Sequence, residues 1–184
     1  AHALGRKFHY DARHANHAAS LAVQLFDALR EEHGLGEHER LLLETACILH
    51  DIGTYVNPSA HHKHGQYLVA NSEIFGLRRA DLDIIANVIR YHRKAMPKST
   101  HLSYMALTGE QRLAVLKLAS LVRVADGLDR GHGRTIERIH IDRREGDVLI
   151  SPGGVNPTRW LEKTSVTSKA DLFEEVFGLK VVLL

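Results

Sequence analysis

The stretch Ala46-Cys47-Ile48-Leu49-His50-Asp51-Ile52-Gly53 decides the fold, because an apolar helical run ends there in two side chains that can bind a metal. Residues 37 to 50 carry apolar side chains at helical spacing, which predicts a helix with one buried stripe. His50 continues the helical row of Leu43 and Ala46, so we expect its side chain to point inward.

Asp51 distinguishes two interpretations of this helix end. A histidine at a helix C-terminus can simply interact favourably with the helix dipole. An aspartate is disfavoured at the same place, and a buried carboxylate is costly unless it is paired or bound to a cation. We therefore favour a metal site over a plain helix terminus.

Two further residues, His14 and Asp126, are predicted to face the same interior. His14 shares a helical row with Ala18, Leu21 and Leu25, although a lone histidine there could also be a core residue bonded to a backbone carbonyl. Asp126 shares a row with Val115, Ala119 and Val122, and a buried acid again needs a partner. With the His50-Asp51 pair they predict a site of two histidines and two carboxylates. Such a site suits a divalent ion such as Mn, Fe, Co, Ni, Zn or Mg.

Helical periodicity covers the first part of the chain, and β-rich pieces follow it. Apart from the helix at 37–50, the spacing predicts helices at 11–33, about 59–72, 79–93 and about 108–129, with a loop at 94–107. The remainder predicts a hairpin within 135–150, a loop at 152–157, a short helix at 170–177 and a strand at 179–184. The fold class is therefore mainly α, with a helical domain at 1–134 and a small α+β extension at 135–184 packed on it.

The order of these residues resembles a known pattern. His14, Leu49-His50-Asp51-Ile52-Gly53 and Val124-Ala125-Asp126 are similar to the H…HD…D pattern of the HD superfamily of metal-dependent phosphohydrolases. The surrounding residues more specifically resemble the C-terminal HD domain of the exopolyphosphatase and guanosine pentaphosphate phosphohydrolase family. The segments that carry this resemblance include His61 to Gly65, Val88 to Lys94 and Asp126 to Arg130. It extends over roughly residues 10 to 184 and implies an HD-type helical fold.

The resemblance implies a metal-dependent phosphohydrolase that cleaves phosphomonoester or phosphoanhydride bonds of a nucleotide-like or polyphosphate-like substrate. His50 and Asp51 are the expected catalytic residues, with Asp51 also orienting the attacking water. That family places its polyphosphatase chemistry in an actin-like domain ahead of this region, and no segment here resembles the glycine-rich phosphate loops of that domain. The alternative is therefore a non-catalytic domain that binds polyphosphate or mediates dimerisation.

The resemblance also implies additional metal ligands. His64 and His92 resemble the extra ligands of HD enzymes that hold two metal ions. His61 and His62 fit a solvated helix start as well as they fit a ligand role. We expect a single tightly held ion, because no further acid lies near His64 or His92 in the sequence.

Basic residues accompany the candidate ligands along the sequence. The fork of an arginine matches phosphate oxygens, and a lysine supplies a point charge. Any one of these residues alone would be a solvated helix end, but as a group they predict binding to a substrate phosphate. They are Lys63, Arg93, Lys94, Arg130 and Arg134.

Composition narrows the range of partners. The formal net charge of +2 over 184 residues is too small for a general nucleic-acid binder, and no apolar run is long enough to span a membrane. Cys47 is the only cysteine, which favours a reducing, cytoplasmic compartment. We therefore predict a phosphorylated small molecule or polyphosphate as the ligand, without specific nucleic acid or membrane, and allow for a homodimer.

Overall fold

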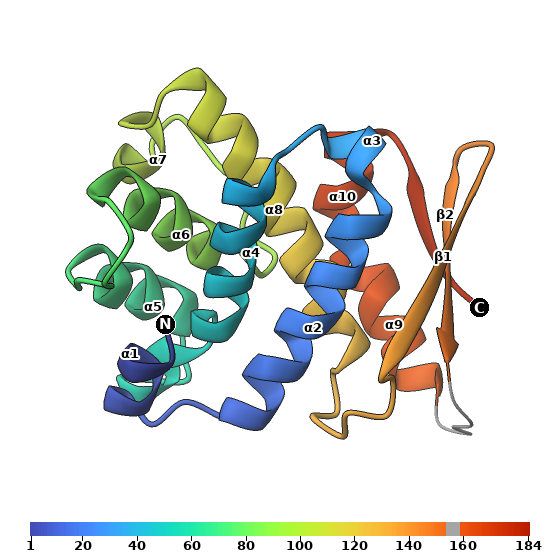
Figure 1. The fold of residues 1–184 in the computed structure, drawn as a ribbon, viewed down its shortest axis with the longest axis horizontal. Helices are drawn as coiled ribbons and strands as arrows, with labels where there is room; N and C mark the ends of the chain where they lie inside the picture. The colour runs from blue at the N-terminus through green and yellow to red at the C-terminus, as the bar shows by residue number, and fades with distance from the viewer. Residues whose placement is uncertain (154–158) are drawn as a thin grey trace.

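The computed structural model describes residues 1–153 and 159–184 and is mainly α-helical with a small sheet near the C-terminus (Figure 1). The helices are α1 (His2–Lys7), α2 (Ala12–Ala28), α3 (Arg30–His33), α4 (Glu37–Leu49), α5 (His61–Ala70), α6 (Arg79–Tyr91), α7 (Leu102–Met105), α8 (Gly109–Leu128), α9 (Arg159–Lys169) and α10 (Asp171–Phe177), with a 3-10 helix η1 (Ile52–Tyr55). The strands are β1 (Arg138–Arg144), β2 (Asp147–Gly153) and β3 (Lys180–Leu183). Among the described residues, no helix is long and apolar enough to cross a membrane.

Helix α8 is the centre of the fold. Every residue from Leu118 to Asp129 is buried, and α2, α4, α6, α9 and α10 all pack against this helix. The start of α8 has a capping box, in which Thr108 and Gln111 each accept a backbone N–H of the other. A helix that is buried on every side must be surrounded by other elements. A polar side chain near its C-terminal end, such as that of Asp126, therefore lies in the interior.

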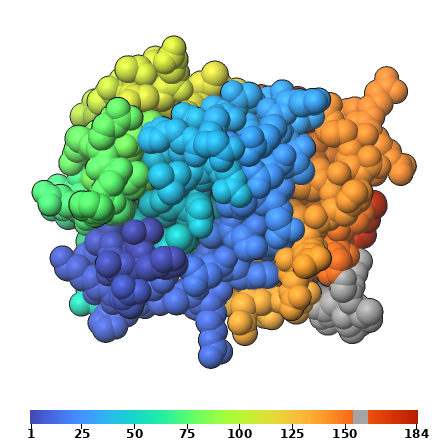
Figure 2. Space-filling model, in the orientation of Figure 1, coloured from blue at the N-terminus to red at the C-terminus, as the bar shows by residue number. Residues whose placement is uncertain are grey.

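The C-terminal extension shares the hydrophobic core of the helices. Strands β1 and β2 form the predicted antiparallel hairpin, and β3 pairs with β2 in parallel. The buried side chains of Val148, Ile150, Val181 and Leu183 belong to the same apolar cluster as those of the helices. Figure 2 shows the hairpin at one end of the molecule, beside α2.

Four parts of the chain differ from the sequence expectations. The helix predicted at 11–33 is interrupted at Leu29, whose backbone is not helical, so that α2 and α3 are separate. The loop predicted at 94–107 contains the short helix α7. Helix α9 was not predicted, because its mostly polar residues lack a clear apolar period. The loop predicted at 152–157 is wrong at residues 152 and 153, which belong to β2, and residues 154–157 lie outside the described part of the chain.

Gly53 allows η1 to lie directly against the start of α5. A Cβ atom at position 53 would be 2.0 Å from the carbonyl oxygen of His61 and 2.4 Å from the amide nitrogen of Gly65. Because both neighbours are backbone atoms, they cannot move aside as the end of a flexible side chain could. This contact therefore sets the distance between the His50-Asp51 pair and α5.

We predict that Gly53→Ala lowers the free energy of unfolding by about 3 kcal/mol, because its Cβ would force the two backbones apart. Gly109→Ala is the matched control, since a Cβ at this first residue of α8 has no neighbour within 4 Å. Its unfolding free energy should stay within about 1 kcal/mol of the wild type. Urea unfolding of the three proteins measures the difference, and equal stability of the two variants would contradict the prediction.

Candidate metal centre

Two histidines occupy equivalent places at the ends of helices. His50 follows the last residue of α4, and His92 follows the last residue of α6. The Nδ1 atom of each ring donates to the carbonyl three residues earlier, that of Cys47 at 2.7 Å and that of Ile89 at 2.6 Å. Because a carbonyl can only accept, each Nδ1 carries the proton and each Nε2 keeps its lone pair.

Two more histidines are held through Nδ1 by other acceptors. His14, on α2, donates from Nδ1 to Oδ2 of Asp129 at 2.8 Å, across 115 residues of sequence. His61, the first residue of α5, donates from Nδ1 to the carbonyl of Pro58 at 3.0 Å. In the neutral form of both rings, Nε2 is again the unprotonated nitrogen.

The four rings face one another as two pairs. The Nε2 atoms of His14 and His50 are 3.3 Å apart, and those of His61 and His92 are also 3.3 Å apart. Two lone pairs directed at each other repel, so each pair requires a proton or a metal ion between them. Histidine held through Nδ1 with a free Nε2 is the usual form of a metal ligand, so these residues fit a bound cation.

A carboxylate accompanies each pair. Asp126 places Oδ1 3.6 Å from Nε2 of His14. Asp51 places Oδ1 3.1 Å from Nε2 of His61, and its Oδ2 lies 3.5 Å from Nε2 of His50. The ligand atoms within each group lie within 4.8 Å of one another, and the two groups are His14, His50 and Asp126, and Asp51, His61 and His92. Asp51 therefore has one oxygen directed at each group.

Both carboxylates are held in the ionised form. Burial acts to raise the pKa of Asp51, but the neighbouring His50, His61 and His92 outweigh it and hold this pKa far below its usual range. Burial also opposes ionisation of Asp126, whose pKa is lowered by the Lys169 ammonium and by His50. Two nitrogens and an ionised oxygen in each group suit ions such as Mn, Fe, Co, Ni or Zn.

The histidines respond differently to burial. Burial lowers the pKa of His92, which keeps its Nε2 free at neutral pH. In His14 burial acts in the same direction, but the hydrogen bond to Asp129 and the charge of Asp126 outweigh it and raise the pKa. A cation at the first group therefore competes with a proton on His14.

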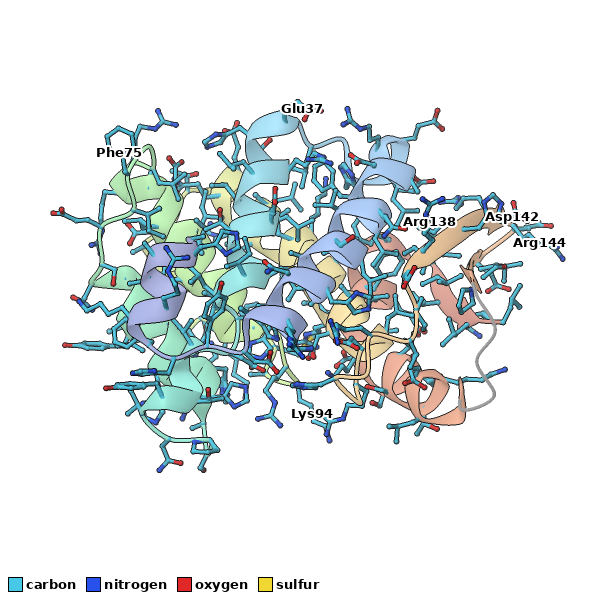
Figure 3. All side chains as sticks on the ribbon, turned by 60° about the horizontal axis from the view of Figure 1, so that its bottom comes forward. Glu37, Phe75, Lys94, Arg138, Asp142 and Arg144 are labelled. Carbon is cyan, nitrogen blue, oxygen red and sulfur yellow. The ribbon has the colours of Figure 1, made fainter. Side chains whose placement is uncertain are left out.

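A cavity of about 380 Å³ opens over these ligands. Its wall includes ligands from both groups and the side chains of Arg93, Lys94 and Arg130. Figure 3 shows Lys94 at the lower edge of the molecule, between the helical part and α9. The cavity thus combines a candidate metal centre with basic side chains that could bind an anion.

The structure brings together five of the six predicted ligands and places His61, rather than His64, beside them. His14, His50, Asp51, Asp126 and His92 belong to the two groups described above. His64 belongs to neither group within the described part of the chain, and His61 lies at that place instead. The difference arises because α5 begins at His61, after a left-handed residue at Ala60, and the site faces this first turn. Spacing alone does not show which histidine stands at the helix start.

The five predicted phosphate-binding residues do not all lie in the same place. Arg93, Lys94 and Arg130 line the cavity over the ligands. Lys63 lines a different cavity, of about 740 Å³, between α5 and α6. Arg134 is not among the residues that line either cavity, and its backbone N–H donates to Oδ1 of Asp129 at 2.8 Å.

Sequence reasoning gave no role to two residues that the structure places beside the ligands. Asp129 holds His14, and Lys169 of α9 contacts Oδ2 of Asp126. Asp129 lies within the Asp126 to Arg130 segment on which the resemblance rests, but its contact with α2 is a tertiary one. Lys169 lies on a helix that was not predicted.

Comparison with known proteins gives one family and several relatives. The model of the family described as "Ppx/GppA phosphatase, domain III" matches residues 1–175. The chain is 28% identical over 120 residues to a guanosine-5'-triphosphate,3'-diphosphate pyrophosphatase of Pseudoalteromonas translucida, which covers 65% of this chain and 23% of that protein. The protein of the same name from Pseudoalteromonas atlantica is 27% identical over 121 residues, which cover 64% of this chain and 24% of that protein. The one from Photobacterium profundum is 29% identical over 119 residues, which cover 63% of this chain and 24% of that protein. The aligned part thus spans about a quarter of the length of these relatives.

We predict that Asp129→Asn weakens Mn²⁺ binding about 10- to 100-fold, the usual effect of losing the partner that orients a ligating histidine. An asparagine amide can donate to Nδ1 of His14, which moves the ring proton to Nε2 and removes the lone pair that faces His50. The control is Asp142→Asn, an exposed residue of β1 that Figure 3 shows far from Lys94. Titration calorimetry measures both affinities, and equal Mn²⁺ binding by the two variants would contradict a role for Asp129.

Proposed function

Because the chain belongs to the Ppx/GppA phosphatase domain III family, we propose that it is an HD-type metal-dependent phosphohydrolase that acts at the candidate metal centre. The observation that carries the proposal is the pair of facing Nε2 atoms in each ligand group. A cavity with basic side chains adjoins them, and Asp126 of the first group and Asp51, His61 and His92 of the second line it. The substrate we propose is a nucleotide or polyphosphate with a phosphoanhydride or phosphomonoester bond. The relatives named as guanosine nucleotide pyrophosphatases support the nucleotide class.

Two metal ions fit the ligand set better than the single ion expected from the sequence. Each group offers two Nε2 atoms and one carboxylate oxygen, and the two oxygens of Asp51 are directed at different groups. When bound, such ions polarise a phosphoryl oxygen and lower the pKa of a coordinated water. We therefore propose that His14, His50 and Asp126 would hold one ion and that Asp51, His61 and His92 would hold the other.

The remaining steps belong to side chains around the cavity. Asp51 is ionised and partly exposed, so it can accept a hydrogen bond from an attacking water and orient it. Arg93, Lys94 and Arg130 can offset the charge that develops on the phosphoryl oxygens. These basic groups accelerate the reaction only to the extent that they bind the transition state more strongly than the substrate.

A non-catalytic role is the second candidate, and one observation favours it. The aligned part spans only about a quarter of each relative, so the reaction that gives those proteins their name can take place in the rest of their chains. This chain would then bind polyphosphate or mediate dimerisation through the same basic cavity. The cytoplasmic location and the homodimer stay predictions under either function.

Phosphate release separates the two candidates. The Mn²⁺-loaded protein is assayed with p-nitrophenyl phosphate, guanosine triphosphate and inorganic polyphosphate. We predict turnover of at least one of them and a loss of about 100-fold or more in His50→Ala and Asp51→Asn. His140→Ala, an exposed histidine of β1, is the control and should keep full activity. Polyphosphate binding without turnover of any substrate would support the non-catalytic role.

Metal content tests the number of ions. We predict about two Mn²⁺ per wild-type chain by elemental analysis and calorimetry, and about one in His61→Ala, because the second group loses a ligand. His64→Ala, one turn further along α5, should retain two. A wild-type content of one ion, or the same loss in both variants, would contradict this assignment.

A further inference from the structure

Helix α9 forms one wall of the cavity over the metal ligands. Leu161, Thr164, Ser165, Ser168 and Lys169 of this helix line the cavity, and the ligands Asp51, His61, His92 and Asp126 also line it. The spacing of the α9 residues by three, four, seven and eight places them on one face of the helix. The extension therefore contributes directly to the site.

Gly127 explains how α9 comes so close to the ligands. A Cβ atom at position 127 would be 3.2 Å from Cα of Val166, so α8 and α9 approach each other at this glycine. Asp126 precedes Gly127 on α8, and Lys169 follows Val166 by one helical turn on α9. The close approach consequently brings Lys169 to Asp126.

Lys169 and Asp126 form a contact within the cavity wall. The ammonium of Lys169 donates to Oδ2 of Asp126, whose Oδ1 is the oxygen that faces His14. The side chain of Lys169 is only 15% exposed, whereas Arg93 and Arg130 are exposed residues. An ammonium has three N–H donors, and this contact uses one of them. Lys169 thus keeps donors for a ligand while the carboxylate fixes its position.

We propose that Lys169 is a phosphate-binding residue of this site, donating from Nζ to a phosphoryl oxygen of the ligand in the cavity. The inference rests on the proposed phosphohydrolase function for its substrate, but it applies equally to a phosphate group that is bound without turnover. A lysine anchored by a carboxylate loses little conformational freedom when the phosphate binds, so its charge is used more effectively than that of an exposed lysine.

Inorganic phosphate is the probe that tests this role. Its affinity for the Mn²⁺-loaded protein is measured by calorimetry in the wild type, Lys169→Met, Lys169→Arg and Lys163→Met. Lys163 is an exposed lysine of the same helix and serves as the matched control. We predict that Lys169→Met weakens phosphate binding about tenfold or more, because a hydrogen bond to a charged group is lost. Lys169→Arg should stay within about threefold of the wild type, and Lys163→Met should be unchanged.

Mn²⁺ affinity separates phosphate binding from a purely positioning role. Lys169→Met should bind Mn²⁺ nearly as tightly as the wild type, since Oδ1 of Asp126 and the histidine ligands remain. An equal loss of Mn²⁺ and phosphate affinity would show that Lys169 only positions Asp126 and would overturn the proposal. Undetectable phosphate binding in the wild type, or binding that is unaffected in Lys169→Met, would also overturn it.

The proposed function and this inference fail in different ways. Phosphate binding that depends on Lys169, in a protein that turns over none of the substrates, contradicts the phosphohydrolase and leaves Lys169 as a binding residue. Turnover with phosphate binding independent of Lys169 contradicts this inference alone.

Discussion

A single type of hydrogen bond, from histidine Nδ1 to the carbonyl three residues earlier, is the constraint on which the candidate centre depends. It occurs where α4 ends at His50 and where α6 ends at His92. A helix leaves its last carbonyls without intrahelical partners, and each histidine satisfies one of them. The same bond fixes the ring proton on Nδ1 and directs Nε2 away from the helix. Ending the helix and presenting a candidate metal ligand are therefore one interaction, so the two interpretations of the His50 helix end are compatible.

Burying several histidine rings and carboxylates side by side opposes folding, and the surrounding helices offset this unfavourable free energy. Facing lone pairs and buried carboxylates destabilise a chain unless partners are supplied. Asp129 supplies one for His14 and Lys169 supplies one for Asp126, while the apolar residues of α8 bury enough surface to hold these contacts in place. A cation that binds only the folded chain would add to its stability by mass action. The arrangement thus fits the proposed role in ligand binding better than a purely stabilising role.

The sequence predicts the side-chain orientations that depend on helical spacing. It does not predict the contacts between elements that are distant in the sequence. His50 and Asp126 follow apolar helical rows, so their inward orientation is visible in the sequence. Whether His61 or His64 faces the site depends on the residue at which α5 begins. This start depends in turn on the contact between Gly53 and the backbone of α5. Lys169 was not identified because α9 is too polar for its apolar period to be recognised. Its position follows from close packing at Gly127, which no local pattern encodes.

The extension is more closely joined to the helical part than a boundary at residue 134 implies. Its strands complete the same apolar cluster as the helices, and α9 supplies both a cavity wall and the partner of a ligand carboxylate. The match to the family model runs to residue 175, past this boundary and past Lys169. A site built from residues 1–134 alone would leave Asp126 without its ammonium partner and open the cavity on one side. The unit that carries the candidate site is therefore the helical part together with α9.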